Sequence, residues 1–225
     1  MQKIMVVGGG RSQIEIIRKA SSLGLSVAVV DKNSNAPGFK YADYKINLDT
    51  QDYLGCLKQS EEIGIDAITT SAAHHALTTI GYVNDKLGLY GHSLKTINHC
   101  TNKDLFRKKL VNSKYSIKYK KCNDVDEVLE FTDEIGFPII MKLTDSSGSR
   151  GVVSCQNDHE VRTFYDCLKK ESNSGKVLCE EYVQGQEYSI ESITTNNKTK
   201  IIAITEKCTS GRPYFVEIGH VTPPH

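Results

Sequence analysis

Tryptophan is missing from this sequence of 225 residues, and so is any long apolar run. Its apolar runs, such as Ser26–Val30, have the length of a β-strand, whereas a transmembrane helix needs about 20 apolar residues. The segment Met1–Val7 leads directly into glycines and is too short for the apolar core of a signal peptide. We therefore expect a cytoplasmic protein without a membrane partner.

An excess of either charge is also lacking, because 28 Lys and Arg residues stand against 27 Asp and Glu residues. Proteins that bind nucleic acid mainly through its phosphates carry a clear positive excess, so no nucleic-acid partner is expected. The seven cysteines are dispersed and include no CxxC pair. This spacing argues against a disulfide framework and against a zinc site, and the sequence predicts no metal ligands among these residues.

The first part of the chain alternates between strand and helix patterns. Ile14, Ile17 and Leu23 recur at helical spacing between two strand-like segments, and such a unit normally forms a right-handed parallel crossover. The predicted strands are 3–7, 26–30, 45–48 and 65–69, and the predicted helices are 14–23, 50–63 and 75–87. Residues 1–98 are therefore expected to form a small, doubly wound α/β domain.

The remaining residues, 99–225, have the pattern of an α+β domain. Its predicted helices are 101–111, 125–135 and 158–170, and its predicted strands are 138–143, 152–155, 177–179, 187–193, 201–205 and 214–218. The chain ends at His225 in a proline loop directly after the last of these strands, with no closing helix. We therefore expect an incomplete domain in a chain that has been cut.

A glycine turn after the first strand allows two interpretations. Backbone N–H groups of Gly8–Gly10 at a strand-to-helix turn could meet an anion, and Asp31 at the end of the next strand could hold a ribose. These features are typical of a dinucleotide site. However, Gln13 stands where the third glycine of that motif is expected, so a plain tight turn is the favoured interpretation.

A lysine inside an apolar strand gives a stronger signal. Lys142 lies within the run Phe137–Leu143, and a loop of small and hydroxylated residues, Ser146–Gly151, follows it. A buried lysine is costly unless an anion pairs with it, and small residues allow a loop backbone to close over phosphates. The alternative is an ordinary β-hairpin whose lysine reaches solvent.

A third pattern lies between two later strands. The pair Glu180 and Glu181 ends an apolar strand, a short linker with Gly185 follows, and the next strand begins near Glu187. Such a linker can offer backbone groups to a purine edge, and a carboxylate beyond it can accept hydrogen bonds from ribose hydroxyls. A hairpin with solvated glutamates explains the pattern equally well.

The neighbouring histidines His74 and His75 precede a predicted helix, and we expect them to have a structural role.

Taken in order, these features resemble the ATP-grasp superfamily, in the branch of biotin carboxylase, the carbamoyl phosphate synthetase large subunit and the purine-pathway ligases. They are also similar to the bacterial amino-acid ligases of that superfamily. The resemblance implies a pre-ATP-grasp domain at 1–98 and a partial ATP-grasp domain at 99–225. Within the latter it implies a linker helix at 99–113, a small lobe at about 114–182 and the start of a large lobe at 183–225.

The resemblance also implies roles for particular residues. It implies contacts to ATP by Lys103, Lys142, Ser146, Ser147, Gly148, Ser149, Gly151, Glu180, Glu181, Tyr182, Val183 and Glu187. Among these, Lys103 and Lys142 would bind phosphates, Glu180 and Val183 would offer backbone groups to adenine, and Glu187 would hold the ribose. It implies direct participation in catalysis by Lys142, Arg150, Glu217 and His220.

The chemistry that the resemblance implies is an ATP-dependent ligation. ATP would phosphorylate a small-molecule carboxylate, and an amine or ammonia would then displace phosphate from the acyl phosphate. Mg²⁺ would assist, with its ligands expected beyond residue 225, so the 225-residue chain alone should bind ATP weakly and catalyse nothing. Bicarbonate activation like that of carbamoyl phosphate synthetase or biotin carboxylase, a non-catalytic nucleotide-binding module and a dinucleotide-dependent oxidoreductase are the alternatives, and a homodimer is compatible with the resemblance.

Overall fold

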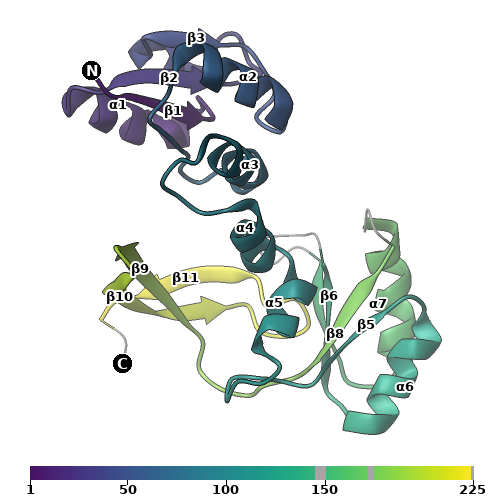
Figure 1. Cartoon of the computed structure of the whole chain (residues 1–225). Helices are drawn as coiled ribbons and strands as arrows, with labels where there is room; N and C mark the ends of the chain where they lie inside the picture. Colours follow the sequence, from purple (N-terminus) through teal and green to yellow (C-terminus); the bar gives the residue numbers. More distant parts are fainter. Residues whose placement is uncertain (145–150, 172–174, 224–225) are drawn as a thin grey trace. The chain divides into compact units, whose positions relative to one another are not determined.

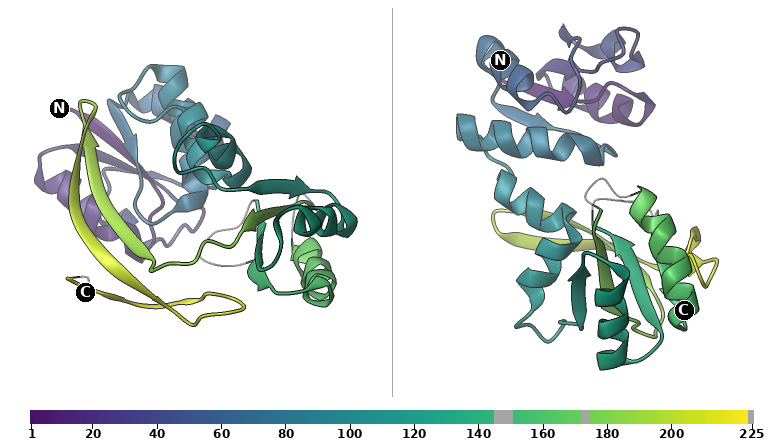
Figure 2. Two further views of the ribbon diagram at one scale, coloured as in Figure 1. Left: turned by 90° about the horizontal axis from the view of Figure 1, so that it is seen from below. Right: turned by 90° about the vertical axis from the view of Figure 1, so that its right-hand side faces the viewer.

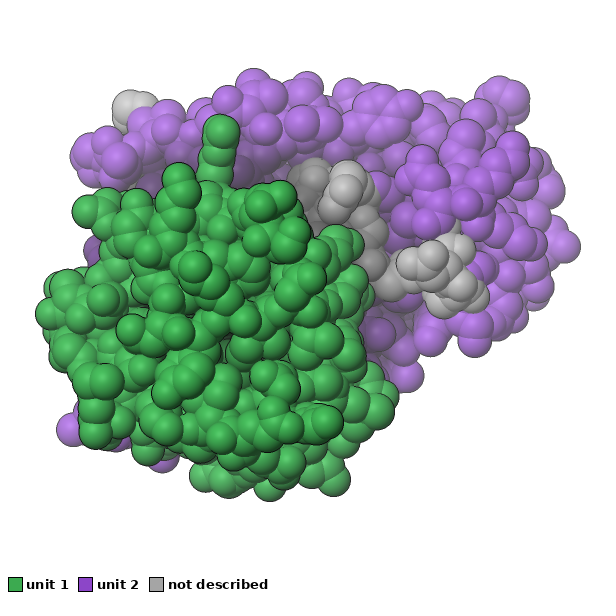
Figure 3. Space-filling view, turned by 90° about the horizontal axis from the view of Figure 1, so that it is seen from above, with its two compact units in different colours: residues 1–101 green, residues 102–225 purple. Residues whose placement is uncertain are grey.

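The computed structural model describes residues 1–144, 151–171 and 175–223. The chain divides into two compact units, unit 1 at Met1–Thr101 and unit 2 at Asn102–His225, which are coloured separately in Figure 3. Among the described residues, every helix is too short or too polar to cross a membrane. The predicted α/β fold class, with a parallel sheet in one region and antiparallel sheets in the other, is confirmed.

Unit 1 is built on a parallel sheet with the strand order β3-β2-β1-β4, of which Figure 1 labels the first three strands. Its strands are β1 (Lys3–Val7), β2 (Ser26–Val30), β3 (Tyr44–Ile46) and β4 (Ala67–Thr69). Its helices are η1 (Arg11–Gln13), α1 (Ile14–Ser22), η2 (Pro37–Tyr41), α2 (Tyr53–Ile63), η3 (His74–Ala76), α3 (Leu77–Leu87) and α4 (Leu94–Thr101). The order reverses at β1, as in doubly wound folds.

Helices cover both faces of this sheet, which explains why its central strands are apolar throughout. Met5 and Val7 of β1 pack in a cluster with residues of α2 and α3, whereas Val6 packs in a second cluster with Ile17 of α1 and Phe39 of η2. Successive side chains of a strand point to opposite faces, so a sheet buried on both faces needs apolar residues at every position.

Unit 2 contains an antiparallel sheet of order β5-β8-β6-β7 and a second antiparallel sheet of order β11-β10-β9. The strands are β5 (Tyr119–Cys122), β6 (Ile139–Leu143), β7 (Val152–Cys155), β8 (Val177–Glu181), β9 (Tyr188–Thr195), β10 (Lys198–Thr209) and β11 (Glu217–Val221). The helices are α5 (Lys103–Leu110), α6 (Val125–Ile135) and α7 (Asp158–Glu171). Figure 2 shows α6 and α7 side by side on one face of the first sheet.

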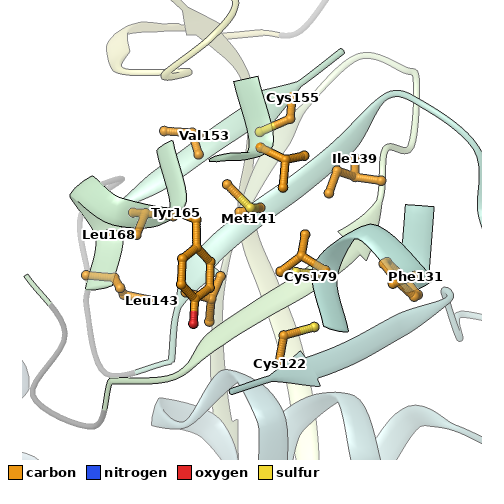
Figure 4. Close-up of a cluster of buried hydrophobic side chains, with 13 residues drawn as sticks. Cys122, Phe131, Ile139, Met141, Leu143, Val153, Cys155, Tyr165, Leu168 and Cys179 are labelled. Carbon is orange, nitrogen blue, oxygen red and sulfur yellow. The ribbon is translucent and has the colours of Figure 1, made fainter. Parts of the chain in front are cut away.

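The core of unit 2 lies between this sheet and the two helices (Figure 4). Ile139, Met141 and Leu143 of β6 point into it, together with Phe131 of α6 and Tyr165 of α7. Met141 is fully buried, and truncating such a side chain to alanine costs about 2–5 kcal/mol. By strand alternation, the residues between them on β6 face the opposite side of the sheet, where α5 contributes its side chains.

The sequence predictions differ from the structure at three places. The predicted helix 101–111 is observed as α5, which begins at Lys103 because Asn102 adopts an extended backbone and its side chain accepts a hydrogen bond from Leu105 N, whereas the preceding helix α4 was not predicted. The strand β5 was not predicted, since its sequence is mostly polar. The predicted strand 214–218 begins only at Glu217, because the backbone of Phe215 has a φ of 49°, which a strand does not tolerate.

Candidate functional site

A cavity of about 360 Å³ lies within unit 2, next to the face of the first sheet opposite its helical core. This volume falls in the range of small-molecule sites, roughly 300–1,000 Å³. The lining residues are Lys103, Arg107, Ile117, Ile140, Lys142, Val152, Glu180, Glu181, Tyr182, Val183, Glu187, Lys207 and Phe215. The structure therefore brings together seven of the residues that the sequence nominates: Lys103, Lys142, Glu180, Glu181, Tyr182, Val183 and Glu187.

Lys142 faces this cavity because of its position in β6. Ile140 pairs with Glu180 and Lys142 pairs with Leu178, so the lysine and the glutamate are diagonal neighbours across β6 and β8. Diagonal neighbours on one face lie within reach of long side chains. The amine Nζ of Lys142 donates to Oε2 of Glu180 at 2.6 Å, and the two side chains are 21% and 3% exposed.

A second cation, Arg107 of α5, also binds Glu180. Its Nε donates to Oε1 at 2.7 Å and its Nη2 donates to Oε2 at 2.9 Å, a two-pronged contact. Burial acts to raise the pKa of the Glu180 carboxyl, but the hydrogen bonds and charges of Arg107 and Lys142 outweigh burial and lower its pKa below the ordinary value. Glu180 is therefore ionised at neutral pH and joins the helix to the sheet.

Lys103 approaches the end of the same strand from the first position of α5. The cap at Asn102 fixes where this helix begins, and the Nζ of Lys103 donates to the carbonyl oxygen of Leu143 at 3.0 Å. Leu143 directly follows Lys142 in β6. A helix start and a strand end thus place two lysines next to one segment of backbone.

Residues at the end of β8 form another wall of the cavity. Glu181 accepts a hydrogen bond from Lys118 N at 3.0 Å. The ring of Tyr182 stacks on Phe215 with centroids 6.0 Å apart, and the guanidinium of Arg212 lies 4.5 Å from the Tyr182 centroid. Val183 is 64% exposed just after the strand. The linker that follows β8 is therefore accessible at Val183. Glu180, in contrast, lies inside β8, which pairs with β5 and β6, so it offers its carboxylate and not its backbone to the cavity.

Glu187 belongs to a chain of charges on the second sheet. Lys207 of β10 places its Nζ 3.1 Å from Glu187 and 3.8 Å from Glu217. His220 Nε2 lies 3.0 Å from the other oxygen of Glu217, and this hydrogen bond lowers the pKa of the Glu217 carboxyl. Glu217 and His220 lie outside the cavity lining, and Glu217 is connected to it through Lys207.

Of the predicted phosphate loop, Ser146–Gly151, only Gly151 belongs to the residues that the structure describes. Ser146, Ser147, Gly148, Ser149 and Arg150 lie outside the described residues. Gly151, which ends the loop, has a φ of 63°, and a Cβ there would lie 2.6 Å from the side chain of Leu143. Only glycine fits this backbone position, which brings the end of the loop against the end of β6.

The described residues do not form a magnesium site. Nowhere in the part of the chain that the structure describes are three or more His, Cys, Asp or Glu side chains arranged to hold a metal ion. Glu187 and Glu217 both bind Lys207, which supplies the positive charge a metal would bring.

In the glycine turn of unit 1, the carboxylate of Asp31 accepts hydrogen bonds from two backbone N–H groups. Gly9 N donates to Oδ2 of Asp31 at 2.8 Å, and Asn33 N donates to Oδ1 of the same carboxylate at 2.8 Å. The side-chain amide of Gln13 donates to the carbonyl of Ser71 across the turn. The acid that a dinucleotide site would use on ribose is thus engaged locally, which supports the interpretation as a plain turn.

Sequence patterns missed two cations of the cavity, Arg107 and Lys207. Arg107 follows Lys103 by one helical turn, so the two residues share a face of α5, and this spacing was the available signal. Lys207 lies 20 residues after Glu187, and only the pairing of β9 with β10 brings them together. No local pattern in the sequence marks that contact.

Comparison with known proteins supports this description. Residues 135–225 match the family model of the ATP-grasp domain, and the resemblance to ATP-grasp ligases is thereby confirmed. A formate-dependent phosphoribosylglycinamide formyltransferase from Wolinella succinogenes is 29% identical over 210 residues, which cover 88% of this chain and 52% of that protein. Its counterpart from Prochlorococcus marinus is 27% identical, over 97% of this chain and 54% of that protein.

Solved structures share the fold at lower identity. An L-amino acid ligase from Bacillus licheniformis superimposes with a TM-score of 0.80 at 19% identity, over all of this chain (100%) and 55% of that one. The biotin carboxylase domain dimer of Hydrogenobacter thermophilus 2-oxoglutarate carboxylase, solved with MgADP, ADP and bicarbonate, gives 0.80 at 19% identity, over 99% of this chain and 53% of that one. This chain spans about half the length of the proteins it matches.

Proposed function

We propose, from the premise that this chain carries an ATP-grasp domain, that its cavity in unit 2 binds ATP for an ATP-dependent ligase. The observation that carries the proposal is the meeting of Lys103 and Lys142 in one cavity beside an apolar wall, with Arg107 next to them on Glu180. Fixed cations near a partly buried site are suited to bind phosphates and to neutralise the charge that develops during phosphoryl transfer.

The remaining lining residues suit the other parts of the nucleotide. Ile117, Ile140 and Phe215 offer apolar surface to a purine ring, and the exposed backbone near Val183 offers hydrogen-bonding groups to its edge. Glu187 is half exposed and accepts from Lys207, and its second oxygen is suited to a ribose hydroxyl. ATP would thus lie with its base against the end of β8 and its phosphates toward β6.

The proposed reaction is the ligation of a carboxylate to an amine or to ammonia through an acyl phosphate. A carboxylate oxygen attacks the γ-phosphorus and ADP leaves, after which nitrogen attacks the acyl carbon and phosphate leaves. Formate and a phosphoribosylglycinamide are the first substrates to test, since two curated relatives are named for them. Bicarbonate is the second carboxylate to test, because a structural neighbour was solved with it.

The proposal assigns a different domain to each of the two regions of the chain. Residues 1–98 are assigned to a pre-ATP-grasp domain and residues 99–225 to part of the ATP-grasp domain. The activity is proposed for a protein of the relatives' full length, acting in the cytoplasm, and the homodimer remains a proposal with a dimeric structural neighbour as its support. Mg²⁺ is expected with the nucleotide, as in that neighbour.

Two assays test the proposal. The 225-residue chain should bind ATP in a calorimetric titration and should bind NADH no better than a mock protein. A protein of full ligase length should release ADP when given ATP and formate, and hydroxylamine should trap the acyl phosphate as a hydroxamate. NADH binding without ATP binding would instead favour an oxidoreductase, and ATP binding without hydroxamate from any carboxylate would favour a non-catalytic nucleotide module.

A further inference from the structure

Arg107 has an unusual position among the cations of the cavity. Its guanidinium binds both oxygens of Glu180, at 2.7 and 2.9 Å, and its side chain is only 19% exposed. This two-pronged geometry is available to arginine and not to lysine. The contact also joins two segments that are 73 residues apart in sequence, α5 and β8.

Glu180 therefore serves two cations at once. Its Oε2 accepts from Arg107 Nη2 at 2.9 Å and from Lys142 Nζ at 2.6 Å. With both cations present, the group of three side chains carries one surplus positive charge. Without Arg107, the single negative charge of Glu180 would be balanced by Lys142 alone, and the surplus would vanish.

We propose that Arg107 is a positioning residue that makes Lys142 available to the nucleotide. Because Arg107 neutralises Glu180 by itself, Lys142 can exchange Oε2 for a phosphate oxygen without leaving a buried carboxylate unpaired. A buried charge left without its partner is strongly unfavourable, so a Lys142 that was the sole partner of Glu180 would stay bound to it. This inference rests on the proposed ATP site and adds how its lysine is released.

Two simpler roles for Arg107 make different predictions. If Arg107 only fastened α5 to the sheet, its loss would lower stability, and the molecules that remain folded would bind ATP normally. If Arg107 contacted the nucleotide itself, removal of Glu180 could not compensate for the loss. In the proposed role, Glu180 is the reason that Arg107 is needed, so removing both should restore binding.

The test compares ATP dissociation constants, measured by calorimetry on the 225-residue chain, for wild type, Arg107→Met, and Arg107→Met with Glu180→Gln. We expect Arg107→Met to raise the dissociation constant at least about tenfold, and the double variant to return it to within about threefold of wild type. Lys109→Met is the matched control, because it removes a positive charge from an exposed position on the same helix. It should change the ATP dissociation constant less than about twofold.

Circular dichroism confirms that each variant is folded at the titration temperature. Should Arg107→Met fail to fold, Arg107→Lys keeps the charge with one donor group and should weaken ATP binding about threefold. The inference would be overturned, while the ATP site stands, by either of two results. One is wild-type affinity in Arg107→Met, or in Arg107→Lys where that variant replaces it. The other is no recovery of affinity in the double variant. A wild-type chain that does not bind ATP would overturn the proposed function, and the inference with it.

Discussion

Two regions of the chain carry patterns that suggest a nucleotide, and their structures differ in how charge is balanced. In the glycine turn of unit 1, both carboxylate oxygens of Asp31 accept backbone hydrogen bonds, from Gly9 and from Asn33. In unit 2, four cationic and three acidic side chains line one cavity. The acid beside the glycine turn is thus engaged by the fold itself, whereas the charged groups of unit 2 line an open cavity.

The sharpest test of this difference is Lys142→Met. We expect it to raise the ATP dissociation constant at least about 30-fold, because a partly buried charge opposite a phosphate is removed. Glu180 keeps its two-pronged contact with Arg107, so the variant should still fold. Calorimetric titration measures the loss, and Lys198→Met on an exposed part of β10 is the matched control, expected within about twofold of wild type. Equal losses of ATP affinity in the two variants would show that ATP does not bind in this cavity.

The next largest effect is expected in unit 1, on stability rather than on binding. A Cβ at Gly38 would lie 2.7 Å from Ile17 and 2.8 Å from the carbonyl oxygen of Gly9. Gly38→Ala should therefore lower the free energy of unfolding by about 1–3 kcal/mol in urea titrations, with ATP affinity of the folded protein unchanged. Gly219→Ala, where no atom lies within 4 Å, should be close to neutral. A large loss of ATP affinity in Gly38→Ala would contradict the assignment of the nucleotide site to unit 2.

The stability that Glu180 contributes should depend on pH. Its pKa in the folded protein is below the ordinary value of 4.5, so its contribution to stability is fully present above pH 4.5. That contribution is lost as the pH falls through the folded-state pKa. Wild type should therefore exceed Glu180→Gln in melting temperature at pH 7, and the difference should shrink as the pH is lowered below 4.5. A constant difference between pH 7 and pH 3 would show that the charge of Glu180 is not what stabilises unit 2.

The smallest effect is expected from Asp31→Asn. It weakens the hydrogen bonds to Gly9 and Asn33 and should cost about 1 kcal/mol of unfolding free energy, measured by urea titration. ATP affinity should be unchanged, because the turn belongs to unit 1 and the proposed site to unit 2. A loss of NADH or ATP binding in this variant would show that the carboxylate of Asp31 serves a ligand.

Much of the fold could be predicted because its signals are local. Alternation and apolar runs located β1, β2 and β6, and a lone lysine in an apolar strand pointed to Lys142. Helix α4 (Leu94–Thr101) was not predicted, since its sequence is largely polar and Ile97 is its one buried residue.

The parts of the candidate site that could not be predicted depend on long-range packing. The role of Arg107 requires α5 to lie over β8, and the role of Lys207 requires the exact register of β9 against β10. The resemblance assigned backbone contacts to Glu180, whereas the structure shows its side chain engaged by two cations, a feature set by strand pairing and helix docking together. No window of sequence contains all of these partners.

Photoaffinity labelling with 8-azido-ATP tests most directly which of the two regions binds the nucleotide. After irradiation of the 225-residue chain and proteolysis, the label should appear on peptides that contain residues 177–187 or 207–215, and unlabelled ATP should suppress it while NAD⁺ should not. Labelling confined to residues 8–38, or labelling that ATP fails to suppress, would contradict the account.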